Sequence, residues 1–116
     1  MGLGRDIRIR DESHARMLAD EAIYGFEAQQ IALDRSGRAA LLRDRAGRVI
    51  LVKVHGAQFA GRLLGPRSSA TIWEDGGRTS LEADSGERLF GKALLDVDDP
   101  EIWVNAINAA KVDSHA

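Results

Sequence analysis

The sequence contains no cysteine, only two prolines, and aromatic residues at just 5% of its positions. Without cysteine there is no disulfide framework, no thiol nucleophile and no zinc site with a cysteine ligand, although cysteine-free secreted proteins do exist. No apolar run has the length of a signal peptide or a membrane span. We therefore expect a cytoplasmic protein that does not cross a membrane.

The composition fits one soluble globular domain with a single core, because 116 residues with 44% hydrophobic and 29% charged positions suit neither disorder nor two domains. The charge is uneven along the chain. Residues 35–67 hold eight basic residues and the single acid Asp44, whereas residues 74–101 hold nine acidic and three basic residues. A basic stretch of this kind either attracts an anionic partner or is an ordinary solvated surface, and the sequence leaves both open.

Glycine-containing turns recur at intervals of 9 to 11 residues between residues 37 and 86, which predicts short antiparallel strands joined by hairpins. Gly76-Gly77 is the clearest turn, because the centre of a primed hairpin turn needs positive φ. We expect strands at 29–34, 38–43, 48–54, 57–64, 69–74, 78–83 and 87–95. Gly61 and Gly91 fall inside these strands and predict bulges or bends that curve the sheet towards a small barrel.

The third expected strand is apolar on both faces, since only Lys53 interrupts the apolar residues between Val49 and Val54. A second element must cover its outer face. Three candidates remain open: the C-terminal helix, residues 1–28, or a second subunit.

A helix is expected near residues 100–112, where Asp99, Pro100 and Glu101 form a favourable helix start. Trp103, Ala106, Ile107 and Ala110 then share one helical face, with Trp103 as its anchor. Residues 1–28 are expected to be an extension with an extended arm at 5–10 and a short helix at 11–21, capped by Asp11 or Ser13. The main domain would span residues 29–113.

The segment from Asp99 to Ile107 resembles the last helix of the pleckstrin-homology-like superfold, in which a Trp precedes an aliphatic residue and, three and four positions on, Ala and Ile. Seven antiparallel strands followed by one helix is also the element order of that family. The resemblance implies a mainly β fold, a seven-stranded antiparallel meander forming a small barrel closed by the C-terminal helix. It also implies a binding module rather than a catalyst. Residues 1–28 show no such match.

Lipid-binding members of this family hold head-group phosphates with basic residues around the first hairpin, where this chain has Arg35 and Arg38. The short loop and Asp34 depart from that pattern, because an acid repels phosphate. The candidate ligand-binding residues are Arg35, Arg38, Arg43, Arg45, Arg48 and Lys53. Many members of the family bind proteins and no lipid, so a protein-binding role ranks first.

We expect no catalytic residue, cofactor or metal, because the three histidines lie in separate regions and no nucleophile has an orienting base and acid. Residues 86–92 match a phosphate-loop pattern except that Ala93 replaces the required Ser or Thr. Nucleic acid is not an expected partner, because the basic stretch has Phe59 as its only aromatic residue. Trp73 is kept as a possible interaction residue, although burial in the core is the favoured interpretation.

These observations support a non-enzymatic interaction domain that binds a protein segment or copies of itself, giving a possible homo-oligomer. The alternative is peripheral binding of an anionic lipid or a phosphorylated small ligand through the basic 35–67 face.

Overall fold

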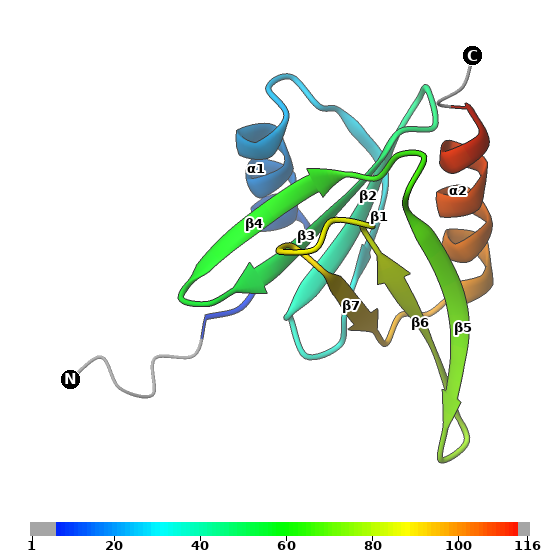
Figure 1. Cartoon of the computed structure of the whole chain (residues 1–116). Coiled ribbons are helices and arrows are strands. Elements are labelled where there is room, and N and C mark those ends of the chain that lie inside the picture. Colours follow the sequence, from blue (N-terminus) through cyan, green and yellow to red (C-terminus); the bar gives the residue numbers. More distant parts are fainter. Residues whose placement is uncertain (1–6, 114–116) are drawn as a thin grey trace.

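The computed structural model describes the backbone of residues 7–113 and the side chains of residues 7–110. Its elements are α1 (Glu12–Ala22), β1 (Ala28–Leu33), β2 (Ala39–Asp44), β3 (Val49–His55), β4 (Gln58–Leu63), β5 (Ser69–Asp75), β6 (Arg78–Asp84), β7 (Lys92–Leu95) and α2 (Pro100–Asp113) (Figure 1). The mainly β class, with seven antiparallel strands and a C-terminal helix, is confirmed.

The strands form two sheets, one in the order β1-β2-β3-β4 and the other in the order β5-β6-β7. Every neighbouring pair is antiparallel and consecutive in the chain. Among residues 7–113 no strand pairing joins the two sheets into a closed barrel. They do meet where the β1–β2 turn contacts the end of β7, since the backbone N–H of Arg35 donates to the carbonyl of Asp96 at 3.0 Å.

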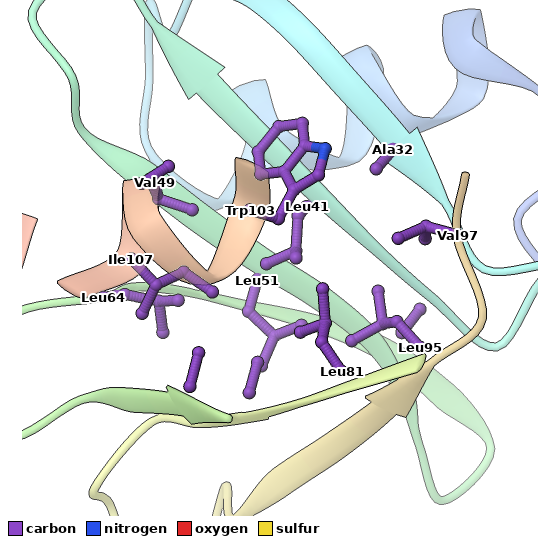
Figure 2. Close-up of a cluster of buried hydrophobic side chains, with 14 of the residues drawn as sticks. Ala32, Leu41, Val49, Leu51, Leu64, Leu81, Leu95, Val97, Trp103 and Ile107 are labelled. Carbon is purple, nitrogen blue, oxygen red and sulfur yellow. The ribbon is translucent and has the colours of Figure 1, made fainter. Parts of the chain in front are cut away.

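The main core lies between the two sheets and α2 (Figure 2). Trp103, 6% exposed, points from α2 towards Leu41 of β2, and Ile107 one turn later is fully buried beside Leu64. The predicted helical face, with Trp103 as its anchor, is confirmed. Burying one indole and several aliphatic side chains stabilises the position of α2 by roughly 1.5–3 kcal/mol for each large side chain.

A second core covers the outer face of the four-stranded sheet. Leu18 of α1 and Phe26 pack there with Leu42, Ile50 and Val52. Of the three candidates for covering the apolar strand, the structure therefore selects the first 28 residues. Of the two possible caps, Asp11 caps α1, accepting a hydrogen bond from the backbone N–H of His14 at 2.8 Å.

Gly61 was expected to mark a bulge or a bend, and the bulge interpretation is wrong. The pairing of β3 with β4 runs through Gly61 without a shift in register, and the bulge in this sheet lies in β1 between Ala28 and Gln30. A Cβ at Gly61 would lie 2.9 Å from the Cβ of Ala22. The glycine therefore allows α1 to approach β4 closely.

The β5–β6 hairpin is confirmed, and its pairing continues to the last pair, Asp75 and Arg78. Gly76 and Gly77 both adopt positive φ, as a primed turn requires. The tip of the hairpin projects past the start of α2 (Figure 1), and every residue from 71 to 79 is exposed.

The expected strand at 87–95 is wrong over its first five residues. β7 begins at Lys92, and residues 85–91 form a compact turn in which the Gly91 N–H donates to the carbonyl of Glu87 at 2.8 Å. The Ser85 hydroxyl donates to the carbonyl of Gly91 at 2.7 Å. Phe90 is buried without belonging to a strand, so its apolar character reflects a turn side chain inserted into the main core.

Candidate functional site

The six basic residues chosen from the sequence do not form one site. Arg35 and Arg38 precede β2, whereas Arg43, Arg45 and Arg48 lie at its far end, and a six-residue strand spans roughly 20 Å. Lys53 pairs with Ala39 across the sheet, at the Arg38 end. The structure therefore divides the basic stretch into two groups.

Arg35 is engaged by acids of the β7–α2 loop. Its Nε lies 3.3 Å from Oδ2 of Asp96, and its Nη2 lies 3.5 Å from Oδ1 of Asp98. The hydrogen bond with Asp96 and then the attraction of that carboxylate raise the pKa of Arg35 above its ordinary value. An anion at Arg35 would have to compete with these carboxylates.

Asp34, the acid that departs from the lipid-binding pattern, is 7% exposed and points into the protein. Its carboxylate accepts hydrogen bonds from the backbone N–H groups of Ser36 at 3.2 Å and Arg38 at 3.3 Å, and from the Ser36 hydroxyl. Asp34 therefore holds the β1–β2 turn together instead of facing a ligand.

At the far end of β2, Arg48 is paired with Asp44, with 2.6 Å between Nε and Oδ2, and its guanidinium lies 5.4 Å from the centre of the Phe26 ring. Burial raises the pKa of Asp44, but the hydrogen bonds and charge of Arg48 outweigh this and hold the pKa below its ordinary value. Arg43 donates to Gln30 at 2.9 Å. Among residues 7–110, only Arg45 of this group has no side-chain partner.

Two cations and a histidine ring surround Phe90 on the inner face of the four-stranded sheet, towards the end of β3 that carries Lys53 and His55. The Lys53 Nζ and the Arg62 guanidinium each lie 4.9 Å from the ring centre, and the His55 ring stacks at 6.0 Å with an interplanar angle of 4°. We call Lys53, His55, Arg62 and Phe90 the Phe90 cluster. Sequence reasoning identified Lys53 alone. Alternation places Lys53 and His55 on one face of β3, but only the tertiary structure brings Phe90 to them.

Lys53 differs from its cationic neighbours because no carboxylate of the described side chains pairs with it. Its Nζ donates to the backbone carbonyl of Lys92 at 3.2 Å, and partial burial lowers its pKa. Arg62 by contrast pairs with Glu87 at 3.0 Å, and Lys92 pairs with Glu82 at 3.6 Å. Lys53 is therefore the cation in this region with unsatisfied capacity for an anion.

Trp73 is 46% exposed, so the favoured expectation that it is buried is wrong. It lies opposite Ser80 near the tip of the hairpin, on the face of β5 opposite to the one whose register partner Leu81 is buried in the main core. A hollow of about 330 Å³ between the tip end of the hairpin and the start of α2 is lined partly by Thr79 and Ile102. We call this part of the molecule the acidic end, consisting of Ile72, Trp73, Glu74, Asp75, Asp98, Asp99, Glu101 and Ile102.

A pocket of about 520 Å³ lies between residues 8–12, the β1–β2 turn and the β7–α2 loop, and it reaches Trp103. Its lining carries both signs of charge, including Arg10, Arg35, Asp96 and Asp99. Because these charges lie close together and Arg35 pairs with Asp96, the pocket does not point to one class of ligand.

Neither a metal-binding group nor a membrane-spanning helix is found in the part of the chain that the structure describes. No three histidine, aspartate or glutamate side chains there are grouped to hold a metal ion. No helix there is long and apolar enough to cross a membrane. Residues 86–92 form the β6–β7 turn and the first residue of β7, which is not the strand-to-helix setting of a phosphate loop.

Comparison of this chain with protein-family models, with curated proteins and with solved structures found no match.

Proposed function

We propose that this chain is a non-enzymatic binding module that contacts another protein through its acidic end. The observation that carries the proposal is the exposure of Trp73 on a projecting hairpin. The chain has only two tryptophans, and one of them is placed where nothing in the described residues covers nearly half of it. Tryptophan is enriched at protein interfaces, where the large ring contributes much of the binding energy.

The neighbours of Trp73 support the same proposal. Ile72 and Ile102 are also exposed at this end of the molecule, Ile72 on the face of β5 opposite to Trp73, so both faces of the hairpin present a large apolar side chain. Single exposed apolar residues are common on protein surfaces, whereas several together with a polar rim are typical of an interaction site. The five carboxylates of the acidic end supply such a rim.

We also propose that the fold is a variant of the pleckstrin-homology-like barrel. The order of seven strands and one helix, the division into sheets of four and three strands, and the inward position of Trp103 support this proposal. The contact between the β1–β2 turn and the end of β7 would form one closed corner of such a barrel. A fold of this kind hosts many functions, so the function itself rests on the exposed surface.

The test of protein binding is site-specific photo-crosslinking with the full chain. A photoreactive phenylalanine analogue replaces Trp73 in one variant and Leu89, which is 88% exposed on the β6–β7 turn, in the other. We expect covalent adducts with a discrete partner at position 73 and none at position 89. Equal labelling at both positions, or no labelling at 73, would contradict the proposal. Light scattering of the unmodified chain shows whether the partner is a second copy.

A second candidate function is binding of a phosphate-bearing ligand at the Phe90 cluster. Lys53 carries it, because it is a partly buried cation without a carboxylate partner among the described side chains. A phosphate oxygen beside Lys53 would stabilise the charged ammonium group, which partial burial disfavours. Arg38, exposed at the same end of the sheet, lies opposite Val54 and so, by alternation, on the other face from Lys53, which leaves Lys53 as the cation of this candidate site.

Titration with inorganic pyrophosphate and co-sedimentation with anionic vesicles test this candidate and separate a free phosphate from a lipid head group. Lys53→Gln should abolish binding, whereas Arg67→Gln, an exposed arginine outside the cluster, should preserve it despite the equal change in charge. Equal losses in the two variants would indicate unspecific attraction, which moderate salt also weakens.

A further inference from the structure

We propose that the acidic end binds an extended basic segment of a partner protein, in which arginine or lysine side chains flank an apolar residue. This inference rests on the proposed protein-binding function and specifies the chemistry of the partner. It follows from the charges, the apolar side chains and the free strand edge at this end of the molecule.

Most carboxylates of the acidic end have no cation partner among the described side chains. Glu74, Asp75, Asp99 and Glu101 are exposed, and none of them pairs with a cation of residues 7–110. Asp98 alone reaches a basic side chain, Arg35, at 3.5 Å. Arg78, which lies opposite Asp75 in the hairpin, reaches Asp96 at 3.5 Å and forms no ion pair with the exposed acids of the acidic end. The acidic end therefore keeps a negative field that a cation can enter.

Two cations near this end, Arg35 and Arg78, are both engaged by Asp96, and the far end of the hairpin is distant. The hairpin tip stands at one end of β6, and the backbone of Arg67 contacts Gly86 just beyond the other end. A seven-residue strand spans roughly 24 Å. Exposed charges separated by more than about 8 Å are largely screened at physiological ionic strength. The exposed carboxylates that have no cation partner among the described side chains are therefore open to a cation from outside the chain.

The acidic end also exposes large apolar side chains. Ile72 and Trp73 lie within the acidic hairpin, and Ile102, 52% exposed, lines the hollow between Thr79 and Glu101. A free metal ion or polyamine would satisfy the carboxylates but leave these side chains in water. A segment that alternates basic and apolar residues satisfies both at once.

β5 is an edge strand of its sheet. β5 pairs with β6 and with no other strand among the described residues, and its residues 71–75 are exposed although α2 packs against β5, so the outer edge of this part offers unpaired backbone groups. An extended segment can add to such an edge, and its side chains then alternate between the two faces of the sheet. Ile72 and Trp73 lie on opposite faces of β5 and would contact alternate side chains of the added segment.

The same charges disfavour other occupants. Symmetric pairing of two acidic ends would place like charges together, and an anionic membrane would be repelled. The basic side chains of the Phe90 cluster in a second copy are already engaged, because the Arg62 guanidinium and the Lys53 ammonium contact an aromatic ring and Arg62 also pairs with Glu87. A basic segment from another protein is the occupant that fits.

The experiment uses the full chain and three fluorescent synthetic peptides of equal length. In one peptide arginine alternates with leucine, in the second with serine, and in the third glutamate alternates with leucine. Fluorescence anisotropy should show the tightest binding for the arginine–leucine peptide, about tenfold weaker binding for arginine–serine, and none for glutamate–leucine. Raising the salt concentration should weaken binding without abolishing it.

Two pairs of variants locate the site. Glu74→Lys with Asp75→Lys should weaken binding of the arginine–leucine peptide at least about tenfold, whereas Glu21→Lys with Glu27→Lys should preserve it. The two double variants change the net charge equally, and Glu21 and Glu27 are exposed acids outside the acidic end. Trp73→Ala should also weaken binding, and Leu89→Ala should not.

Equal weakening by the two charge-reversal pairs, or equal affinity for the leucine and serine peptides, would overturn the inference. If crosslinks form at position 73 while no basic peptide binds, the protein-binding function stands and this partner class is wrong. If neither occurs, both proposals are wrong.

Discussion

The Oδ1 atom of Asp34 accepts a 2.8 Å hydrogen bond from the backbone N–H of Asp96, which lies 62 residues later in the chain. The other oxygen of the same carboxylate holds the β1–β2 turn, so this one buried side chain joins that turn to the segment between β7 and α2. Arg35 reinforces the junction from outside through Asp96 and Asp98. The junction fixes how the two sheets meet at this corner.

Asp34→Ala should therefore lower the free energy of unfolding by about 2–4 kcal/mol, because several buried donors lose their acceptor at once. Urea denaturation followed by circular dichroism measures the change. Asp75→Ala, at an exposed carboxylate without a partner in the described residues, is the control and should change stability by less than about 0.5 kcal/mol. Similar values for the two variants would show that Asp34 does not hold the corner together.

Substitution of the two tryptophans should have very different effects on stability. Trp103→Ala should cost about 3–5 kcal/mol, because it empties the centre of the main core. Trp73→Phe should leave stability nearly unchanged and remove the component of the fluorescence that acrylamide quenches readily. The remaining emission, from Trp103, should be blue-shifted and protected until the chain unfolds. Strong quenching of that emission would show that Trp103 is not buried.

Gly86→Ala should destabilise the chain far more than Gly56→Ala. Both glycines have positive φ, which costs about 1 kcal/mol for alanine. A Cβ at Gly86 would also lie 2.3 Å from the carbonyl oxygen of Arg67, whereas at Gly56 it would meet no atom within 4 Å. Thermal unfolding of the two variants measures the difference, and equal melting temperatures would contradict the close contact.

The loss of stability at acid pH should depend on Arg48. The folded-state pKa of Asp44 lies below its ordinary value of 3.8, so Asp44 stabilises the folded chain above that pH and this contribution is lost as the pH falls through the folded pKa. Arg48→Ala removes the side-chain hydrogen bond and the charge that lower the pKa, and leaves the burial that raises it and the backbone hydrogen bonds from residues 46 and 48. We expect lower stability at neutral pH and a shallower loss of stability in acid.

Carboxyl resonances recorded by NMR across the acid range check this expectation directly. The pKa of Asp44 should move up in Arg48→Ala and stay in place in Arg45→Ala, which removes a neighbouring charge without a side-chain partner among the described residues. An unchanged Asp44 titration in both variants would show that the pair does not control it.

Strand positions were predictable wherever local chemistry decides them. The Gly76-Gly77 turn and the apolar face of α2 follow from the φ preference of glycine and from helical spacing, which neighbouring residues settle among themselves. The segment 87–91 was mispredicted because Phe90 has strand-like apolar character, while the Ser85 and Gly91 bonds close a turn around it. Local pattern alone does not distinguish an inserted side chain from a paired one.

The candidate site was less predictable, because it depends on contacts between distant parts of the chain. The sequence by itself determined the element order, the turns and the uneven charge, since these depend on residue type and short spacing. Only the tertiary structure decided that α1 covers β3, that Asp96 engages Arg35 and that Trp73 stays exposed. Burial and ion pairing depend on which segments meet in space. The packing of the two cores decides this, and it joins residues that are far apart in the sequence.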